Sequence, residues 1–122
     1  MTRHKILLAD DDEGLLRLVG TTLGTDDFDV ITASDGEAAI SAARAEHPEL
    51  ILLDINMPGL DGLEVCRLLK RDPATSAIKI VMLTASGAEQ DRSRAVDAQA
   101  DDYFVKPFSP VALLDKVYAL LS

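Results

Sequence analysis

The chain has 122 residues, and 48% of them are hydrophobic, which is enough to bury the core of one compact domain. Its formal charge of −9, with no cluster of Lys or Arg, argues against direct binding to nucleic acid or to an anionic membrane surface. The single cysteine, Cys66, excludes a disulfide framework and favours a reducing, cytoplasmic setting, and the N-terminus has the pattern of neither a signal peptide nor a membrane span.

Short apolar segments alternate with segments of helical periodicity along the whole chain. Continuous or alternating apolar residues predict strands, and apolar residues recurring every three to four positions predict helices. In chain order the predicted elements are strand 5–9, helix 15–23, strand 28–32, helix 34–46, strand 50–54, helix 63–70, strand 78–84, helix 86–98, strand 102–106 and helix 110–121.

Capping and breaking residues support these boundaries. Ser34-Asp-Gly-Glu37 and Ser86-Gly-Ala-Glu89 are typical of capping boxes, which predicts a serine N-cap for each of two helices. Ser109-Pro110 is typical of an N-cap followed by Pro at the first helical position. Gly24 and His47-Pro48 are predicted to end the first and second helices.

Strict alternation of this kind predicts a parallel sheet that is covered by helices on both faces. In such a sheet every strand-to-helix loop lies at one edge, where ligands bind. These loops contain Asp10–Asp12, Asp54–Asn56, Thr84–Ser86 and Lys106-Pro107. If strand 5–9 is central and lies beside strand 50–54, the acidic loops meet at that edge.

Four motifs, each at the end of a predicted strand, carry a family resemblance. They are the acidic run 10–12, the segment Asp54-x-Asn56-Met-Pro-Gly-x-Asp61-Gly62, the pair Thr84-Ala85, and Asp101-Asp102-Tyr103-Phe-Val-Lys106-Pro107-Phe108. With these motifs the chain resembles the receiver domain of two-component response regulators over essentially its whole length. The resemblance implies a single receiver domain over residues 1–122, an α/β flavodoxin-like (βα)5 fold, and a doubly wound parallel sheet in the order 2-1-3-4-5.

The resemblance also implies a role for each site residue. Asp54 matches the phosphoacceptor, which takes a phosphoryl group from a phosphohistidine. Lys106 matches the lysine that contacts a phosphoryl oxygen and pairs with Asp54 when phosphate is absent. The Thr84 hydroxyl and the Ala85 amide match donors to the phosphoryl group, and Tyr103 matches an aromatic ring that reports the state of Thr84.

The same resemblance implies a metal site. Asp11 and Asp54 match direct ligands, Asp10 matches a ligand that acts through water, and the Asn56 carbonyl is expected as a further ligand of Mg²⁺ or Mn²⁺. Helix capping is the alternative for the aspartates, above all for Asp12. Two carboxylates about 5 Å apart repel by roughly 3 kcal/mol at an effective dielectric of about 20, whereas a cap contributes only about 1 kcal/mol, so the crowding favours a bound cation.

The function implied is a phosphorylation-driven signalling switch, which catalyses only its own phosphorylation and slow autodephosphorylation. Its implied partners are a sensor histidine kinase or histidine phosphotransfer protein and a downstream effector protein or domain. The implied output surface, and the site of a phosphorylation-dependent dimer, is formed by helix 86–98, strand 102–106 and helix 110–121. No direct contact with nucleic acid or membrane is expected.

The acidic loops fit three other kinds of site less well. A stand-alone Mg²⁺-dependent phosphohydrolase with an aspartyl-phosphate intermediate would need an acid–base residue two positions after Asp54, and Asn56 stands there. A calcium-binding EF-hand would need a bidentate Glu where the chain has Val65. A flavin mononucleotide site would place its phosphate against the three aspartates of 10–12, which would repel it.

Two further expectations concern the backbone. The resemblance implies a cis peptide bond between Lys106 and Pro107. Gln99 stands where the family commonly has glycine before Ala-Asp-Asp-Tyr, and a left-handed turn would cost a non-glycine residue about 1–2 kcal/mol. We therefore expect the end of the helix before Gln99 to differ in shape from that of the family.

Overall fold

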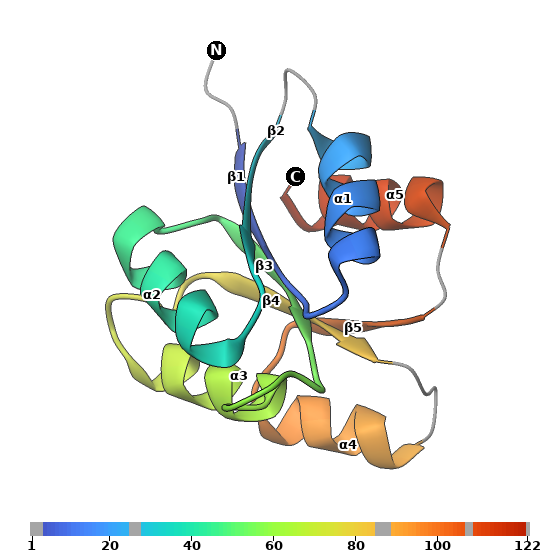
Figure 1. Ribbon diagram of the computed structural model, residues 1–122. Coiled ribbons are helices and arrows are strands. Elements are labelled where there is room, and N and C mark those ends of the chain that lie inside the picture. Colours follow the sequence, from blue (N-terminus) through green and yellow to red (C-terminus); the bar gives the residue numbers. More distant parts are fainter. Residues whose placement is uncertain (1–3, 25–27, 85–88, 107–108, 122) are drawn as a thin grey trace.

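A computed structural model describes residues 4–24, 28–84, 89–106 and 109–121 of the chain (Figure 1). Five strands alternate with five helices in these ranges: β1 (His4–Ala9), α1 (Glu13–Leu23), β2 (Phe28–Ala33), α2 (Gly36–Glu46), β3 (Leu50–Asp54), α3 (Gly62–Arg71), β4 (Lys79–Thr84), α4 (Glu89–Asp97), β5 (Asp102–Val105) and α5 (Pro110–Leu121). Within the described part of the chain, none of the helices has the length and apolar character needed to cross a membrane.

The five strands form one parallel sheet in the order β2-β1-β3-β4-β5, as predicted. Helices α1 and α5 cover one face, and α2, α3 and α4 cover the other (Figure 1). Because all strands run the same way, the carboxyl ends of β1, β3, β4 and β5 lie at one edge of the sheet. We call this the carboxyl edge, and the opposite one the amino edge.

The sheet separates two hydrophobic cores. Alternate residues of the central strands point to opposite faces, so Leu7 and Ile51 pack under α2, α3 and α4, whereas Ile6 and Leu50 pack under α1 and α5. Every residue of β3 is buried, which matches its uninterrupted apolar sequence. Cys66 lies in the first core, where burial raises the pKa of its thiol to about 11.

The helix caps agree with the sequence at two places and correct it at one. The Asp12 carboxylate accepts hydrogen bonds from the N–H groups of Gly14 (2.9 Å) and Leu15 (3.2 Å), and so caps α1. The Ser109 hydroxyl accepts from the Ala112 N–H at 3.2 Å, as predicted.

Ser34, in contrast, is not the N-cap of α2. The helix begins one residue later than the capping box implies, and the carboxylate of Asp35 accepts from the Ala38 N–H at 2.8 Å. An ionised carboxylate is a stronger acceptor than a hydroxyl and is also stabilised by the positive end of the helix dipole. The predicted cap Ser86 lies outside the described residues.

The expectation for Gln99 is wrong. Its φ of 67° places it in the left-handed region, so the turn between α4 and β5 keeps the geometry that glycine would provide. Two hydrogen bonds close this turn, from the Gln99 N–H to the Val96 carbonyl (2.9 Å) and from the Ala100 N–H to the Ala95 carbonyl (3.0 Å). The chain therefore accepts local backbone strain here to connect α4 to β5.

A partly buried ion pair, in which the Asp101 side chain is 37% exposed, links three elements at the amino edge. Lys70, at the end of α3, donates to Asp101 Oδ2 at 2.9 Å and to the Ile78 carbonyl at 2.7 Å. The same Asp101 oxygen accepts from the Ile80 N–H at 2.8 Å, and the Lys70 side chain is only 10% exposed. This pair links α3, β4 and the start of β5, and we refer to it as the amino-edge clamp.

Candidate functional site

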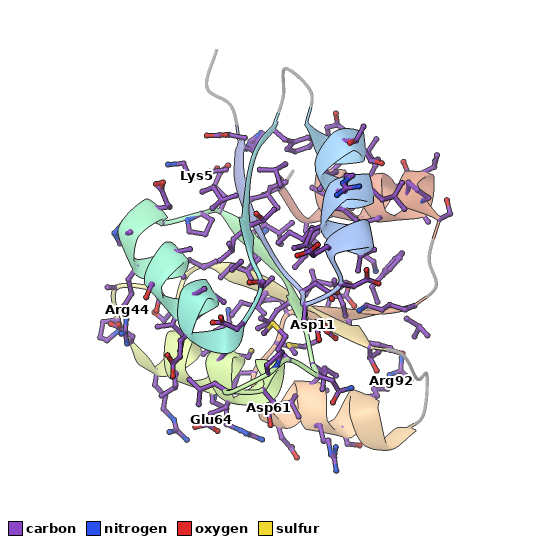
Figure 2. The ribbon with its side chains drawn as sticks, in the orientation of Figure 1. Lys5, Asp11, Arg44, Asp61, Glu64 and Arg92 are labelled. Atoms are coloured by element: carbon purple, nitrogen blue, oxygen red, sulfur yellow. The ribbon has the colours of Figure 1, made fainter. Side chains whose placement is uncertain are left out.

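Three carboxylates meet at the carboxyl edge. Asp10 follows β1 and is fully buried, Asp54 ends β3 with 6% of its surface exposed, and Asp11 is exposed to solvent. One oxygen from each lies within 4.8 Å of the others. Figure 2 labels Asp11 at the point where β1 ends. We call these three residues the acidic cluster; the predicted meeting of the two acidic loops is thus observed.

Close backbone packing fixes the position of Asp54. The N–H of Gly62 donates to the Ile55 carbonyl at 2.8 Å, which brings the start of α3 against the end of β3. A Cβ atom at position 62 would lie 2.0 Å from the Asp54 carbonyl oxygen, so only glycine fits. The Asn56 N–H donates to Asp54 Oδ1 at 3.3 Å and orients the carboxylate. The turn from Met57 to Gly62 therefore supports the site without contributing a charge to its centre.

Lys106 supplies the positive charge that faces the cluster. Its ammonium lies 2.7 Å from Asp10 Oδ2 and 3.6 Å from Asp54 Oδ1. The expected pairing with Asp54 is present, but Asp10 is the closer partner. The Lys106 N–H also donates to the Thr84 carbonyl at 2.7 Å, which ties the end of β5 to the end of β4.

Burial and the excess of negative charge in the cluster together shift the pKa values of Asp54 and Lys106. Burial, followed by the neighbouring charge of Asp10, raises the pKa of Asp54 to about 6, although Lys106 and the Asn56 N–H act in the opposite direction. Burial alone would lower the pKa of Lys106, but the hydrogen bonds and charges of Asp10 and Asp54 together outweigh it and raise that pKa. A second cation near Asp54 would relieve the remaining repulsion between carboxylates.

The donor set of the cluster suits a hard divalent cation. Carboxylate oxygens from Asp10, Asp11 and Asp54 converge from two loops, and Mg²⁺ prefers such oxygen ligands completed by water. Asp12 does not belong to this set, because its carboxylate caps α1. Asn56, two positions after Asp54, is exposed to solvent.

Two of the remaining predicted residues lie on the neighbouring strands. Thr84 ends β4 with only 2% of its surface exposed, one position after Leu83, the residue aligned with Asp54 across β3 and β4. Tyr103 lies on β5 opposite Met82 and is partly buried. Ala85 lies outside the described residues, and so does the Lys106–Pro107 bond with its predicted cis geometry.

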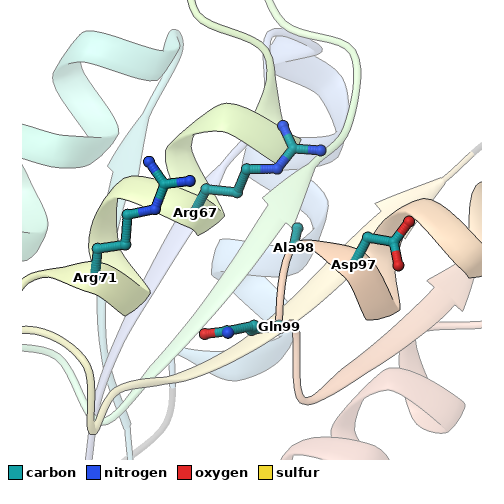
Figure 3. A pocket seen from close by; sticks show the side chains of 5 residues that line it. All are labelled: Arg67, Arg71, Asp97, Ala98 and Gln99. Carbon is teal, nitrogen blue, oxygen red and sulfur yellow. The ribbon is translucent and has the colours of Figure 1, made fainter.

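Two hollows elsewhere are separate from this chemistry. One, of about 110 Å³, lies between the C-terminal ends of α3 and α4 at the amino edge (Figure 3). Its walls are formed by Arg67, Arg71, Asp97, Ala98 and Gln99. Another, of about 230 Å³, is lined by Asp35, Glu37, Pro58 and Gly59. Neither contains a residue of the acidic cluster or Lys106, so convergent charge, and not cavity volume, marks the candidate site.

Sequence reasoning missed two contacts around the site. The closer pairing of Lys106 with Asp10 joins residues 96 positions apart, and no local pattern signals it. Arg92 of α4 lies over the Tyr103 ring, with its guanidinium carbon 5.1 Å from the ring centroid. The sequence feature that comes closest to indicating the Arg92–Tyr103 contact is a basic residue in the polar helix before the strand that contains Tyr103.

Comparisons with known proteins find a matching family model and similar sequences. The sequence model of the response regulator receiver domain family matches residues 6–118. The chain is 43% identical over 121 residues to the probable transcriptional regulator ycf27 of Porphyridium aerugineum, which covers 99% of this chain and 49% of that protein. It is 44% identical over 117 residues to the alkaline phosphatase synthesis transcriptional regulatory protein PhoP of Bacillus subtilis, which covers 96% of this chain and 48% of that protein.

The fold is also similar to that of a solved structure. The chemotaxis protein CheY4 of Vibrio cholerae has a TM-score of 0.92 at 28% identity, covering 98% of this chain and 99% of that one. The chain thus spans about half the length of the two curated relatives and nearly all of CheY4.

Proposed function

This chain belongs to the response regulator receiver domain family, and from that membership we propose that it accepts a phosphoryl group on Asp54 in a Mg²⁺-dependent reaction with a phosphohistidine donor. One observation carries the proposal. Asp54 ends a fully buried strand, with Asp10 and Asp11 oxygens within 4.8 Å and the Lys106 ammonium at 3.6 Å. A nucleophile, a divalent-cation site and a fixed positive charge therefore share one edge of the sheet.

In the proposed reaction a carboxylate oxygen of Asp54 attacks the phosphorus of the donor. The new P–O bond forms as the P–N bond of the phosphohistidine breaks, and its electron pair leaves with the imidazole nitrogen. Phosphoryl transfer depends mainly on positioning and on neutralising charge. The rigid strand end and the Gly62 contact supply the positioning, because they leave the Asp54 backbone little freedom.

Charge neutralisation is divided between two sets of residues. Asp10, Asp11 and Asp54, with the Asn56 carbonyl, would hold Mg²⁺, which when bound offsets negative charge on the phosphoryl oxygens. Lys106 moves its interaction from the carboxylates toward the phosphoryl group. The Thr84 hydroxyl donates a hydrogen bond to that group, and the Ala85 amide is proposed as a second donor.

We propose a signalling switch and not a turnover enzyme. Asn56 stands two positions after Asp54, and its amide cannot act as an acid or base near neutral pH, so loss of the phosphoryl group to water is expected to be slow. The proposed partners are a sensor histidine kinase or histidine phosphotransfer protein and a downstream effector, all in the cytoplasm. Val96, Val105 and Val111 are exposed on α4, β5 and α5, which supports this surface as the output and dimer face.

The test uses acetyl phosphate as a small phosphodonor. Wild-type protein incubated with Mg²⁺ and acetyl phosphate should gain the mass of one phosphoryl group, which neutral-pH mass spectrometry detects. Asp54→Asn should gain none, and Asp97→Asn, which alters an exposed carboxylate of α4, should behave as wild type. A chelator should prevent the reaction in the wild type.

Equal labelling of the wild type and Asp54→Asn would contradict the assignment of the acceptor. Repeated turnover of phosphate esters by the wild type would instead favour the phosphohydrolase.

A further inference from the structure

Arg92 and Tyr103 form a cation–π contact that joins α4 to the sheet. The guanidinium carbon of Arg92 lies 5.1 Å from the centroid of the Tyr103 ring, within the range of an attractive contact. Figure 2 shows the Arg92 side chain extending from α4 toward the sheet. Tyr103 lies on β5, two positions after Asp101 and three before Lys106. The contact thus links an exposed arginine to a strand that ends in the site.

The Tyr103 ring is held from two directions. Part of it packs against the hydrophobic core under α2, α3 and α4. The Arg92 guanidinium covers a face of the same ring. Moving the ring would therefore require either loss of the cation–π contact or a movement of α4 together with it.

Among its described side chains, helix α4 has few other anchors to the sheet. Among the α4 side chains that the structure describes, 92–97, only Ala95 is buried, and Val96 is 69% exposed. Ala98, directly after the helix, is also buried, but an alanine offers little apolar surface. The contact between Arg92 and Tyr103 is therefore a substantial part of what fixes α4 against β5.

We propose that Arg92 is a positioning residue that holds Tyr103, and α4 with it, in the unphosphorylated arrangement, and so opposes the switch. This inference rests on the proposed function, in which phosphorylation of Asp54 changes the environment of Thr84 and Tyr103. A cation–π contact at an exposed site corresponds to about a two- to fivefold shift in a two-state equilibrium. Removing the Arg92 side chain should favour the phosphorylated arrangement by that factor.

The experiment uses protein labelled with 3-fluorotyrosine, whose two tyrosines, Tyr103 and Tyr118, give two ¹⁹F NMR signals. Tyr118→Phe assigns the signals. Beryllofluoride with Mg²⁺ serves as a stable mimic of the phosphoryl group, and its dissociation constant is measured by titration. The variants are Arg92→Ala, Arg92→Lys and the matched control Arg94→Ala, which removes an exposed arginine of the same helix.

Arg92→Ala should shift the Tyr103 signal in untreated protein and lower the dissociation constant for beryllofluoride two- to fivefold. Arg92→Lys, which keeps a cation, should retain most wild-type behaviour, and Arg94→Ala should change neither quantity. A dissociation constant that is unchanged or raised in Arg92→Ala would overturn the inference, as would an unmoved Tyr103 signal. If the wild type fails to bind beryllofluoride at all, the proposed function fails instead, and the signal of untreated protein still tests the contact.

Discussion

The two edges of the sheet combine lysine and aspartate in different proportions. At the amino edge, the Lys70 ammonium faces one carboxylate, Asp101, at 2.9 Å, and two backbone carbonyls complete its hydrogen bonds. At the carboxyl edge, the Lys106 ammonium faces a cluster of three carboxylates and lies closest to Asp10, at 2.7 Å. One lysine against one aspartate is neutral, whereas one lysine against three aspartates leaves two negative charges when all are ionised.

The difference in charge balance indicates that the amino-edge clamp serves stability, whereas the acidic cluster is suited to binding a cation. The amino-edge clamp satisfies its charges within the chain, so removing either partner should only destabilise the fold. The acidic cluster remains short of positive charge, and its cost is visible in the raised pKa of Asp54. Removing a carboxylate should therefore have opposite effects on stability at the two edges.

The largest effect on stability is expected from breaking the clamp. Asp101→Ala removes the acceptor of both Lys70 and the Ile80 N–H, and should lower the free energy of unfolding by about 2 kcal/mol, because solvent at the partly exposed Asp101 weakens the ion pair. Urea denaturation monitored by circular dichroism measures this loss. Asp101→Asn keeps an acceptor oxygen for Ile80 and should lose only about 1 kcal/mol.

The matched control for the clamp is Asp97→Ala. Asp97 is exposed, and the structure gives it no ion pair with any residue it describes, so the free energy of unfolding should change by less than about 0.5 kcal/mol. An equal loss in Asp97→Ala and Asp101→Ala would contradict a specific role for the clamp.

At the carboxyl edge the sign should reverse. Asp54→Asn removes a buried negative charge and should raise the free energy of unfolding by about 1–2 kcal/mol at pH 7 in the absence of divalent cations. The pKa of about 6 already includes the attraction of Lys106, so the gain is the net effect of burial and of the Asp10 charge over that attraction. Adding Mg²⁺ should stabilise the wild type and narrow the difference.

The pH dependence of this gain has a defined direction. A carboxyl whose pKa rises on folding, here to about 6, binds its proton more tightly in the folded state, so wild-type stability falls as pH rises from about 4 to 6. The stability of Asp54→Asn does not fall in this way. Its free energy of unfolding should exceed that of the wild type by the full amount above about pH 6 and equal it near pH 4. An advantage that persists unchanged at pH 4 would argue against Asp54 as its source.

The smallest effect is expected at the turn after α4. Gln99→Gly replaces a residue with a φ of 67° by one that adopts this conformation without strain, and should raise the free energy of unfolding by about 0.5–1 kcal/mol. The net gain is below the full strain energy because glycine also has more freedom in the unfolded chain. Thermal denaturation compares the variant with Ser93→Gly, a change at an exposed position in the middle of α4 that should destabilise instead.

Features that depend on local sequence pattern could be predicted from the sequence. Apolar periodicity predicted the strands and helices, and their alternation together with the family resemblance predicted the sheet order that the structure contains. The meeting of Asp10 and Asp54 follows from topology, since Asp10 comes directly after β1 and Asp54 ends the neighbouring parallel strand β3.

Other features were beyond such patterns because they depend on contacts between distant segments. Lys70 and Asp101 are 31 positions apart, and neither stands in a motif that signals the clamp. The choice of Asp35 over Ser34 as a cap depends on where the chain leaves β2, and both residues are good caps in isolation. Gln99 was misjudged because the connection between α4 and β5 overrides the local preference of a single residue.

The close packing at Gly62 also limits which mutations the gene can tolerate. Every missense change of a glycine codon adds at least a Cβ atom, and at position 62 that atom would overlap the Asp54 carbonyl oxygen at 2.0 Å. No missense change at codon 62 therefore gives a residue that fits, although glycine is the smallest residue and carries no charge. Codon 20 is the opposite case, because a Cβ at Gly20 in α1 would meet nothing within 4 Å. In this chain, the backbone contact behind Asp54 excludes every residue but glycine at position 62.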